Sequence, residues 1–169
     1  MPTLAQSLLQ ELEMEGATTR RVLERVPSDQ LAWKPAALSR SLGELAQHIA
    51  ENPGSVCTMA LQNPAAPPSF AAPVIPTSTA EILATFDASM AQAREILGGM
   101  SDNTLHETWR MSVGGTELMA MPRIALMRAV LLNHWYHHRG QLSVYFRELN
   151  VPVPSIYGPS ADENPFAPA

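Results

Sequence analysis

The sequence has a single cysteine and no long apolar run, and these two shortages exclude several classes of protein. Cys57 has no second cysteine with which to pair, so an internal disulfide is excluded, which fits a reducing compartment. We interpret Cys57 as a small buried apolar residue. No apolar run approaches the roughly 20 residues that a membrane-spanning helix needs. Residues 1–6 carry no basic segment typical of a secretory signal. We therefore expect a cytoplasmic protein that does not enter a membrane.

Charge is also scarce, since charged residues make up only 16% of the chain. The 16 acidic residues outnumber the 11 basic ones, which gives a formal net charge of -5. Phosphate binding requires a basic patch, so this balance argues against nucleic acid as a partner. A length of 169 residues is enough for a hydrophobic core of its own, and we predict one domain spanning residues 1–169.

Apolar residues recur at helical spacing in the first part of the chain. The first predicted helix covers about residues 3–26 and ends at Pro27. A capping-box pattern over residues 41–44 predicts a second helix that begins at Leu42. Pro53-Gly54 lies inside this second run and is expected to kink or split the helix.

The second half of the chain contains an irregular crossover, a hairpin and two further helices. The proline-rich residues 63–76 predict an extended crossover, and a capping box before residues 82–97 predicts a third helix. Residues 109–119, with Gly114-Gly115 at their centre, predict a small hairpin. Residues 122–149 predict the last long helix, with Pro122 as its first residue. We therefore expect an all-α four-helix bundle, up-down-up-down or a variant of it, with an irregular tail.

The most informative stretch is residues 133–141, which reads Asn-His-Trp-Tyr-His-His-Arg-Gly-Gln. His134 and His138 are four residues apart, so on a helix they lie on one face and can bind one ion. They belong to a stripe that we predict to face the bundle interior, formed by Met127, Leu131, His134, His138, Leu142, Tyr145 and Leu149. Two adjacent buried imidazoles need either hydrogen-bond partners or a shared cation, and the pairing within a core stripe favours the cation.

The natural third ligand is His48, which lies on the predicted helix that begins at Leu42. His106 lies in a polar segment and is expected to be exposed, and His137 falls about a quarter turn away from the stripe. We interpret His137 as a residue that supports a ligand or lies at an interface. Three neutral imidazoles leave coordination positions free for water or substrate, which points to chemistry. The segment lacks the glutamate of the zinc-protease signature, because Trp135 occupies its place.

Two neighbours of the histidines are candidates for catalytic roles. Gln141, one turn beyond His138, could orient a ligand by a hydrogen bond or could simply be a polar flank of the stripe. Arg139 could bind an anionic substrate group or a dimer partner, or could form a surface ion pair. Tyr157 in the tail could fold over the site, whereas Glu44 is explained by its capping box.

These motifs resemble the DinB-like (YfiT-related) family of metal-binding four-helix bundles over nearly the whole chain. The resemblance rests on Trp33-Lys34-Pro35 and on residues 43–50, 133–142 and 152–158, with the HxxxHRGQ motif the most specific part. It implies a divalent ion, zinc or nickel, held by His48, His134 and His138, and it implies a homodimer. It also implies a small-molecule substrate, because characterised relatives include S-transferases that use thiols such as bacillithiol, and related bundles include a mycothiol-dependent isomerase.

The leading hypothesis is a metal-dependent enzyme, a thiol S-transferase or a hydrolase, in which a thiol or water attacks a small electrophile. Uncharged ligands leave the ion its full Lewis acidity, which favours this chemistry. Two alternatives stay open. One is a non-catalytic, stress-related protein with a structural ion that ties two helices together. The other is a metal-free bundle that binds a lipid or another ligand.

Overall fold

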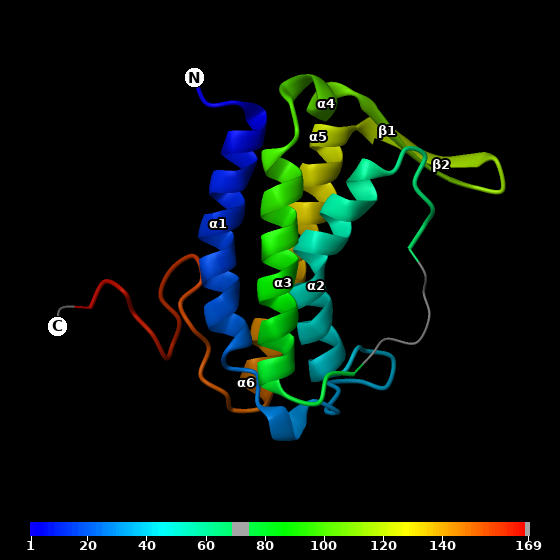
Figure 1. The fold of residues 1–169 in the computed structure, drawn as a ribbon. Helices are drawn as coiled ribbons and strands as arrows, with labels where there is room; N and C mark the ends of the chain where they lie inside the picture. The colour runs from blue at the N-terminus through cyan, green and yellow to red at the C-terminus, as the bar shows by residue number, and fades with distance from the viewer. Residues whose placement is uncertain (69–74, 168–169) are drawn as a thin grey trace.

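Four long helical segments pack side by side in the computed structural model, which describes residues 1–68 and 75–167 (Figure 1). Three of them are α1 (Leu4–Leu23), α2 (Leu42–Leu61) and α3 (Thr79–Gly98). The fourth is composite and consists of α5 (Arg123–Leu126), a π-helix (Met127–Asn133) and α6 (His134–Glu148). The shorter elements are a 3₁₀ helix (Ser28–Gln30), α4 (Asp102–His106), β1 (Thr108–Val113) and β2 (Thr116–Pro122). The predicted all-α bundle with a small hairpin is confirmed.

The four helical segments of the bundle do not simply alternate in direction. Figure 1 shows that α2 and α3 run the same way, while α1 and the last helical segment run the opposite way. The bundle is therefore a variant of the up-down-up-down arrangement, because α2 ends and α3 begins at opposite ends of the bundle. Residues 69–74 of the predicted crossover lie outside the described part of the chain.

The capping boxes locate the starts of the helices as the sequence predicts, with one difference. The Ser41 hydroxyl accepts from the backbone N–H of Glu44 at 3.1 Å, and the Glu44 carboxylate accepts from the N–H of Ser41 at 2.5 Å. Ser78 likewise caps α3. The Glu81 carboxylate, however, accepts from Thr77 instead of closing a box with Ser78. The hairpin is also confirmed, since Gly114 and Gly115 both have positive φ, as a tight two-residue turn requires.

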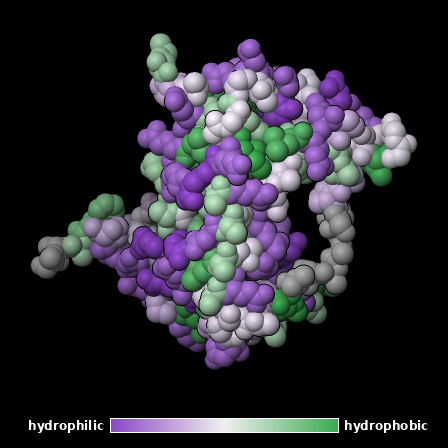
Figure 2. Space-filling model, viewed as in Figure 1, coloured by the Kyte–Doolittle hydropathy of each residue, from purple (hydrophilic) through white to green (hydrophobic). Residues whose placement is uncertain are grey.

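Helix α2 packs against both α3 and the last helical segment and approaches α3 closely. A Cβ atom at Gly54 would lie 3.1 Å from the Cα atom and the carbonyl oxygen of Ser89, closer than side chains usually come to a backbone, so glycine lets the two helices pack this tightly. The Gly54 N–H donates to the Ser89 hydroxyl at 2.8 Å, and this hydroxyl donates to the Glu51 carbonyl at 3.1 Å. The face drawn in Figure 2 is mainly hydrophilic, with hydrophobic residues in small groups, as expected when amphipathic helices bury their apolar sides. Among the described helices, none is long and apolar enough to cross a membrane.

Pro53 does not split α2, which continues from Leu42 to Leu61. Proline has no N–H, so the carbonyl of Ile49, four residues earlier, loses its partner within the helix. The indole Nε1–H of Trp135 on α6 donates to this carbonyl at 2.9 Å, and the bond is buried. The predicted disruption is therefore compensated by a hydrogen bond from a neighbouring helix.

The last helical segment differs from the prediction in two ways. Pro122 is the final residue of β2 and not the first residue of a helix, because its backbone is extended with ψ of 139°. The π-helix also places more residues in each turn than an α-helix does, and this rotates the face that follows it. The buried residues of α6 are Trp135, Arg139, Leu142 and Phe146. The prediction that His134 and His138 occupy the core stripe was therefore wrong, and both are half-buried on its flank.

The π-helix is fastened to α2 by a second buried hydrogen bond. The amide Nδ2–H of Asn52 donates to the carbonyl of Leu131 at 2.8 Å. Asn52 lies one turn beyond His48 on α2, and Leu131 lies three residues before His134. Two buried hydrogen bonds thus fix the position of α2 against the π-helix and α6, both just beyond His48 on α2 and one on each side of His134 along the chain.

The Trp135→Phe replacement should lower the free energy of unfolding by about 1–3 kcal/mol, because the Ile49 carbonyl would stay buried without a donor. In a Pro53→Ala background the same replacement should cost less, since alanine supplies a backbone N–H for that carbonyl. Urea denaturation of the four proteins of this double-mutant cycle measures the difference. Equal costs in the two backgrounds would contradict the account.

Candidate metal centre

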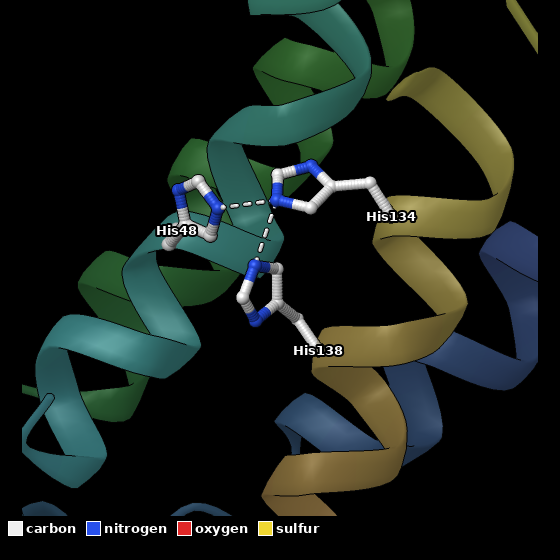
Figure 3. Close-up of side chains that lie close together, drawn as sticks. All are labelled: His48, His134 and His138. Atoms are coloured by element: carbon white, nitrogen blue, oxygen red, sulfur yellow. Dashed lines mark hydrogen bonds between the residues drawn. The ribbon is translucent and has the colours of Figure 1, made fainter. Parts of the chain in front are cut away.

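Three histidines converge between α2 and α6. His48 comes from α2, and His134 and His138 come from successive turns of α6 (Figure 3). The Nε2 atom of His134 lies 3.5 Å from that of His48 and 2.8 Å from that of His138. One ligand atom from each residue lies within 4.8 Å of the others. The structure therefore brings together the three residues that the sequence predicts, and the cluster could hold a metal ion.

The spacing of the three nitrogens suits a small divalent ion. Imidazole nitrogens bound tetrahedrally at zinc distances are about 3.3 Å apart, and the two closest Nε2 separations lie on either side of this value. The three ring planes meet at angles between 71° and 84°, so the rings are not stacked and their nitrogen edges point inward. The geometry fits a common ligand at the centre.

Gln141 fixes the orientation of one ligand. The Nδ1 atom of His138 lies 2.7 Å from the Gln141 Oε1 atom, and because an amide oxygen can only accept, Nδ1 carries the proton. The Nε2 lone pair of His138 is then free and points at the other two imidazoles. This is the supporting contact that metal-binding histidines usually make, and it matches the orienting role considered for Gln141.

The protons of His134 cannot satisfy both of its ring nitrogens and the Nε2 atom of His138 at once. Its Nδ1 is buried and makes no hydrogen bond of acceptable geometry within the described structure. With its proton on Nε2, His134 could donate to Nε2 of His138, but its own Nδ1 would then be a buried acceptor without a donor. With its proton on Nδ1, the Nε2 lone pairs of His134 and His138 would face each other at 2.8 Å. A cation between the Nε2 atoms removes this conflict, because it accepts both lone pairs.

Burial keeps the histidines neutral. The pKa of His48 is lowered to about 4, first because burial disfavours the imidazolium and then because His138, Arg40 and His134 add like charge. The pKa of His138 is also lowered to about 4, chiefly by burial, although its hydrogen bond with Gln141 opposes the shift. The pKa of His134 is lowered by burial against the opposing effect of the Val130 carbonyl. Neutral imidazoles have the lone pairs that a metal needs.

The other two histidines lie outside the cluster. His106 is exposed, as predicted, and its Nδ1 lies 2.8 Å from the carbonyl of Asp102. His137 is also exposed, and its ring centroid lies 4.9 Å from that of His138. It is therefore a neighbour of one ligand and not a member of the converging set.

Arg139 faces α1, on a different side of α6 from the histidines. Its side chain is 1% exposed, and its Nη2 lies 2.6 Å from the Glu15 carboxylate, so the predicted ion pair exists but its surface location was wrong. Arg139 also donates to the Thr19 hydroxyl at 3.0 Å and to the Tyr157 hydroxyl at 2.6 Å. The tail thus folds over Arg139 and not, as predicted for Tyr157, over the histidines. A catalytic role for Arg139 stays a prediction.

Asn52 and Trp135 position the site, and the sequence analysis identified neither residue in that role. The available signal was Pro53, since a proline inside a helix frees a carbonyl four residues earlier. A buried donor on another helix was therefore to be expected. A shallow hollow of about 650 Å³ between α2 and α3, lined by residues such as Glu51 and Gln92, does not include the histidines.

The fold and the site together define a class of protein: a helical bundle in which two neighbouring helices present three imidazoles to one point. The chain belongs to the DinB family, whose model matches residues 1–165.

Three known proteins are similar to this chain. An uncharacterized protein of Bacillus subtilis (strain 168), YrdA, is 29% identical over 160 residues, which cover 92% of this chain and 89% of that protein. A DinB-like protein from Bacillus cereus ATCC 10987 superposes with a TM-score of 0.72 at 23% identity, over 92% of this chain and 98% of that one. The DinB-like protein YjoA of Bacillus subtilis gives a TM-score of 0.64 at 19% identity, over 85% and 92% of the two chains. At these identities the solved structures support the fold alone.

The lowered pKa values predict how the stability of the metal-free protein changes with pH. The unfolded chain binds protons at His48 and His138 near the ordinary pKa of about 6.5, whereas the folded protein binds them near pH 4. Folding stability is therefore full above about pH 6.5 and falls as the pH drops from 6.5 towards 4. Urea midpoints measured in the presence of chelator across this range test the slope.

The matched variants separate this effect from the titration of carboxylates. His48→Gln/His138→Gln should flatten the slope between pH 6.5 and 4, because neither glutamine takes up a proton. His106→Gln removes an exposed histidine and should leave the slope unchanged. A double variant as pH-sensitive as the parent would contradict the assignment.

Proposed function

We propose that this DinB family protein binds one divalent metal ion through His48, His134 and His138 and is a metal-dependent enzyme. The observation that carries the proposal is the convergence of three neutral imidazoles from two helices, with no carboxylate or cysteine in the cluster as described. When bound, the ion supplies Lewis acidity that lets a thiol or a water lose its proton near neutral pH. Imidazole ligands suit zinc and nickel among the common divalent ions.

The residues of the chain hold and orient the ion and do not supply the nucleophile. Cys57 is buried in the core, and burial raises the pKa of its thiol to about 12, so it stays protonated and unreactive. A thiol nucleophile must then come from solution. This supports an external low-molecular-weight thiol or water as the nucleophile and a small electrophile as its target.

Two features favour catalysis over a purely structural ion. Structural zinc sites are usually closed by four protein ligands, whereas this cluster has three among the described residues. The three histidines are half-buried and not fully enclosed, which leaves a side through which a small molecule can reach the ion. Their backbones are held rigidly, because the buried Asn52 and Trp135 hydrogen bonds fix α2 against the π-helix and α6.

Metal binding should require each of the three histidines. The protein should bind one zinc or nickel ion per chain, and its free energy of unfolding should rise by about 2.7 kcal/mol when free ion is about 100 times its Kd. His48→Ala, His134→Ala and His138→Ala should each lose the ion and this stabilisation. Metal content by mass spectrometry and melting curves with and without chelator measure both effects.

The controls for metal binding come from the same chain. His106→Ala removes a histidine outside the cluster and should bind like the parent. Gln141→Leu should weaken binding by about tenfold, because it removes only the group that orients His138. Full retention of the ion by any triad variant would rule out the proposed ligand set.

Catalysis is tested by thiol transfer to 1-chloro-2,4-dinitrobenzene. In this reaction the thiol sulfur forms a bond to the aromatic carbon, chloride leaves, and the thiol proton goes to solvent. With cysteine, bacillithiol or glutathione as the thiol, metal-loaded protein should accelerate product formation, and chelator or His134→Ala should return the rate to background. Tight metal binding without metal-dependent turnover on these thiols or on a panel of esters would instead favour a structural ion.

A further inference from the structure

Among the residues that the structure describes, one basic side chain has no acidic partner. The sequence contains 11 lysines and arginines, and ten of them form ion pairs with carboxylates. Within the described residues, the exception is Arg40, whose guanidinium makes neither an ion pair nor a hydrogen bond. In a chain with a formal net charge of -5, an arginine without a carboxylate partner stands apart.

The loop that carries Arg40 is firmly attached next to the candidate metal centre. Arg40 immediately precedes Ser41, the N-cap of α2, and its carbonyl accepts from the Tyr145 hydroxyl of α6 at 3.2 Å. The Trp33 ring packs edge-on against Tyr145 with centroids 5.5 Å apart. The Trp33 carbonyl also accepts from the N–H of Leu42 at 2.9 Å. These contacts place the backbone of Arg40 between the two helices that supply the histidines.

Arg40 lies on the same side of both helices as the histidines. His48 follows the start of α2 by two turns, and Tyr145 follows His138 by two turns of α6. Two turns span about 11 Å, a gap that a small molecule and an extended arginine side chain can bridge together. The positive charge of Arg40 already reaches the cluster, since it contributes to the lowered pKa of all three imidazoles.

The carboxylate nearest in sequence, Glu44, forms no ion pair with Arg40, although the charge of Arg40 contributes to the lowered pKa of Glu44. Glu44 accepts from the backbone N–H of Ser41 and lies 3.7 Å from the ammonium of Lys34. Its carboxylate is therefore engaged in the helix cap and in another ion pair. The Arg40 guanidinium stays exposed, and its planar fork of donors matches a carboxylate in a two-bond contact.

We propose that Arg40 binds a carboxylate group of the small molecule that coordinates the metal centre, and so selects anionic substrates over neutral ones. This inference rests on the proposed function, because it assigns the charge of the substrate used at the same site. A molecule with a thiol at one end and a carboxylate a few bonds away would place its sulfur at the histidines and its carboxylate at Arg40.

The test uses cobalt-loaded protein and two thiols of similar size. A thiol that binds Co²⁺ gives a sulfur-to-cobalt absorption band, so titration with 3-mercaptopropionate and with 2-mercaptoethanol yields a Kd for each. Arg40→Gln should weaken 3-mercaptopropionate roughly fivefold, the effect of one partly exposed ion pair, and leave 2-mercaptoethanol unchanged. Arg40→Lys should fall between the parent and Arg40→Gln, since it keeps the charge but loses the fork.

The control and the outcomes keep this inference separate from the proposed function. Arg94→Gln makes the same change in net charge at an arginine that pairs with Glu13, and it should alter neither Kd. If both thiols bind and Arg40→Gln weakens both equally or neither, the role of Arg40 is overturned while thiol binding stands. If neither thiol changes the spectrum of the loaded parent protein, the proposed thiol chemistry fails, and the inference about Arg40 fails with it.

Discussion

The hydrogen bond from the Trp135 indole to the Ile49 carbonyl is the interaction on which the geometry of the site depends. It exists because Pro53 cannot donate to that carbonyl, which leaves a buried acceptor available to a donor on the neighbouring helix. Trp135 is adjacent to His134, and Ile49 is adjacent to His48. A helix defect on α2 therefore fixes, through one buried bond, the relative position of two of the three candidate ligands.

The π-helix complements this arrangement from the other side. Its wider turns bring the face of α6 that includes Trp135 and Arg139 into the interior and leave His134 and His138 on the flank beside α2. A regular α-helix with the predicted stripe would have buried both histidines among leucines, away from solvent. The half-buried position is what combines depressed pKa values with access for a small molecule. The π-helix thus determines both how α6 packs in the bundle and how far the two histidines are buried.

Local patterns predicted much of the fold and of the ligand set. The spacing of His134 and His138 and the capping box before His48 depend only on neighbouring residues, and the structure confirms that all three converge. Gly114 and Gly115 predicted the hairpin for the same reason. The π-helix, the parallel course of α2 and α3, and the burial of Arg139 depend on contacts between segments far apart in the sequence. The pairing of Arg139 with Glu15, for example, joins residues that no local pattern relates.

The central claim is that one ion is shared by the Nε2 atoms of two helices, and diffraction from crystals of metal-loaded protein addresses it most directly. Data collected on either side of the zinc or nickel absorption edge locate the ion independently of the protein. The account predicts a single strong anomalous peak between α2 and α6, within bonding distance of Nε2 of His48, His134 and His138, with at least one position not taken by the protein. A peak bound by other side chains, or no peak between these three rings in metal-replete crystals, would contradict it.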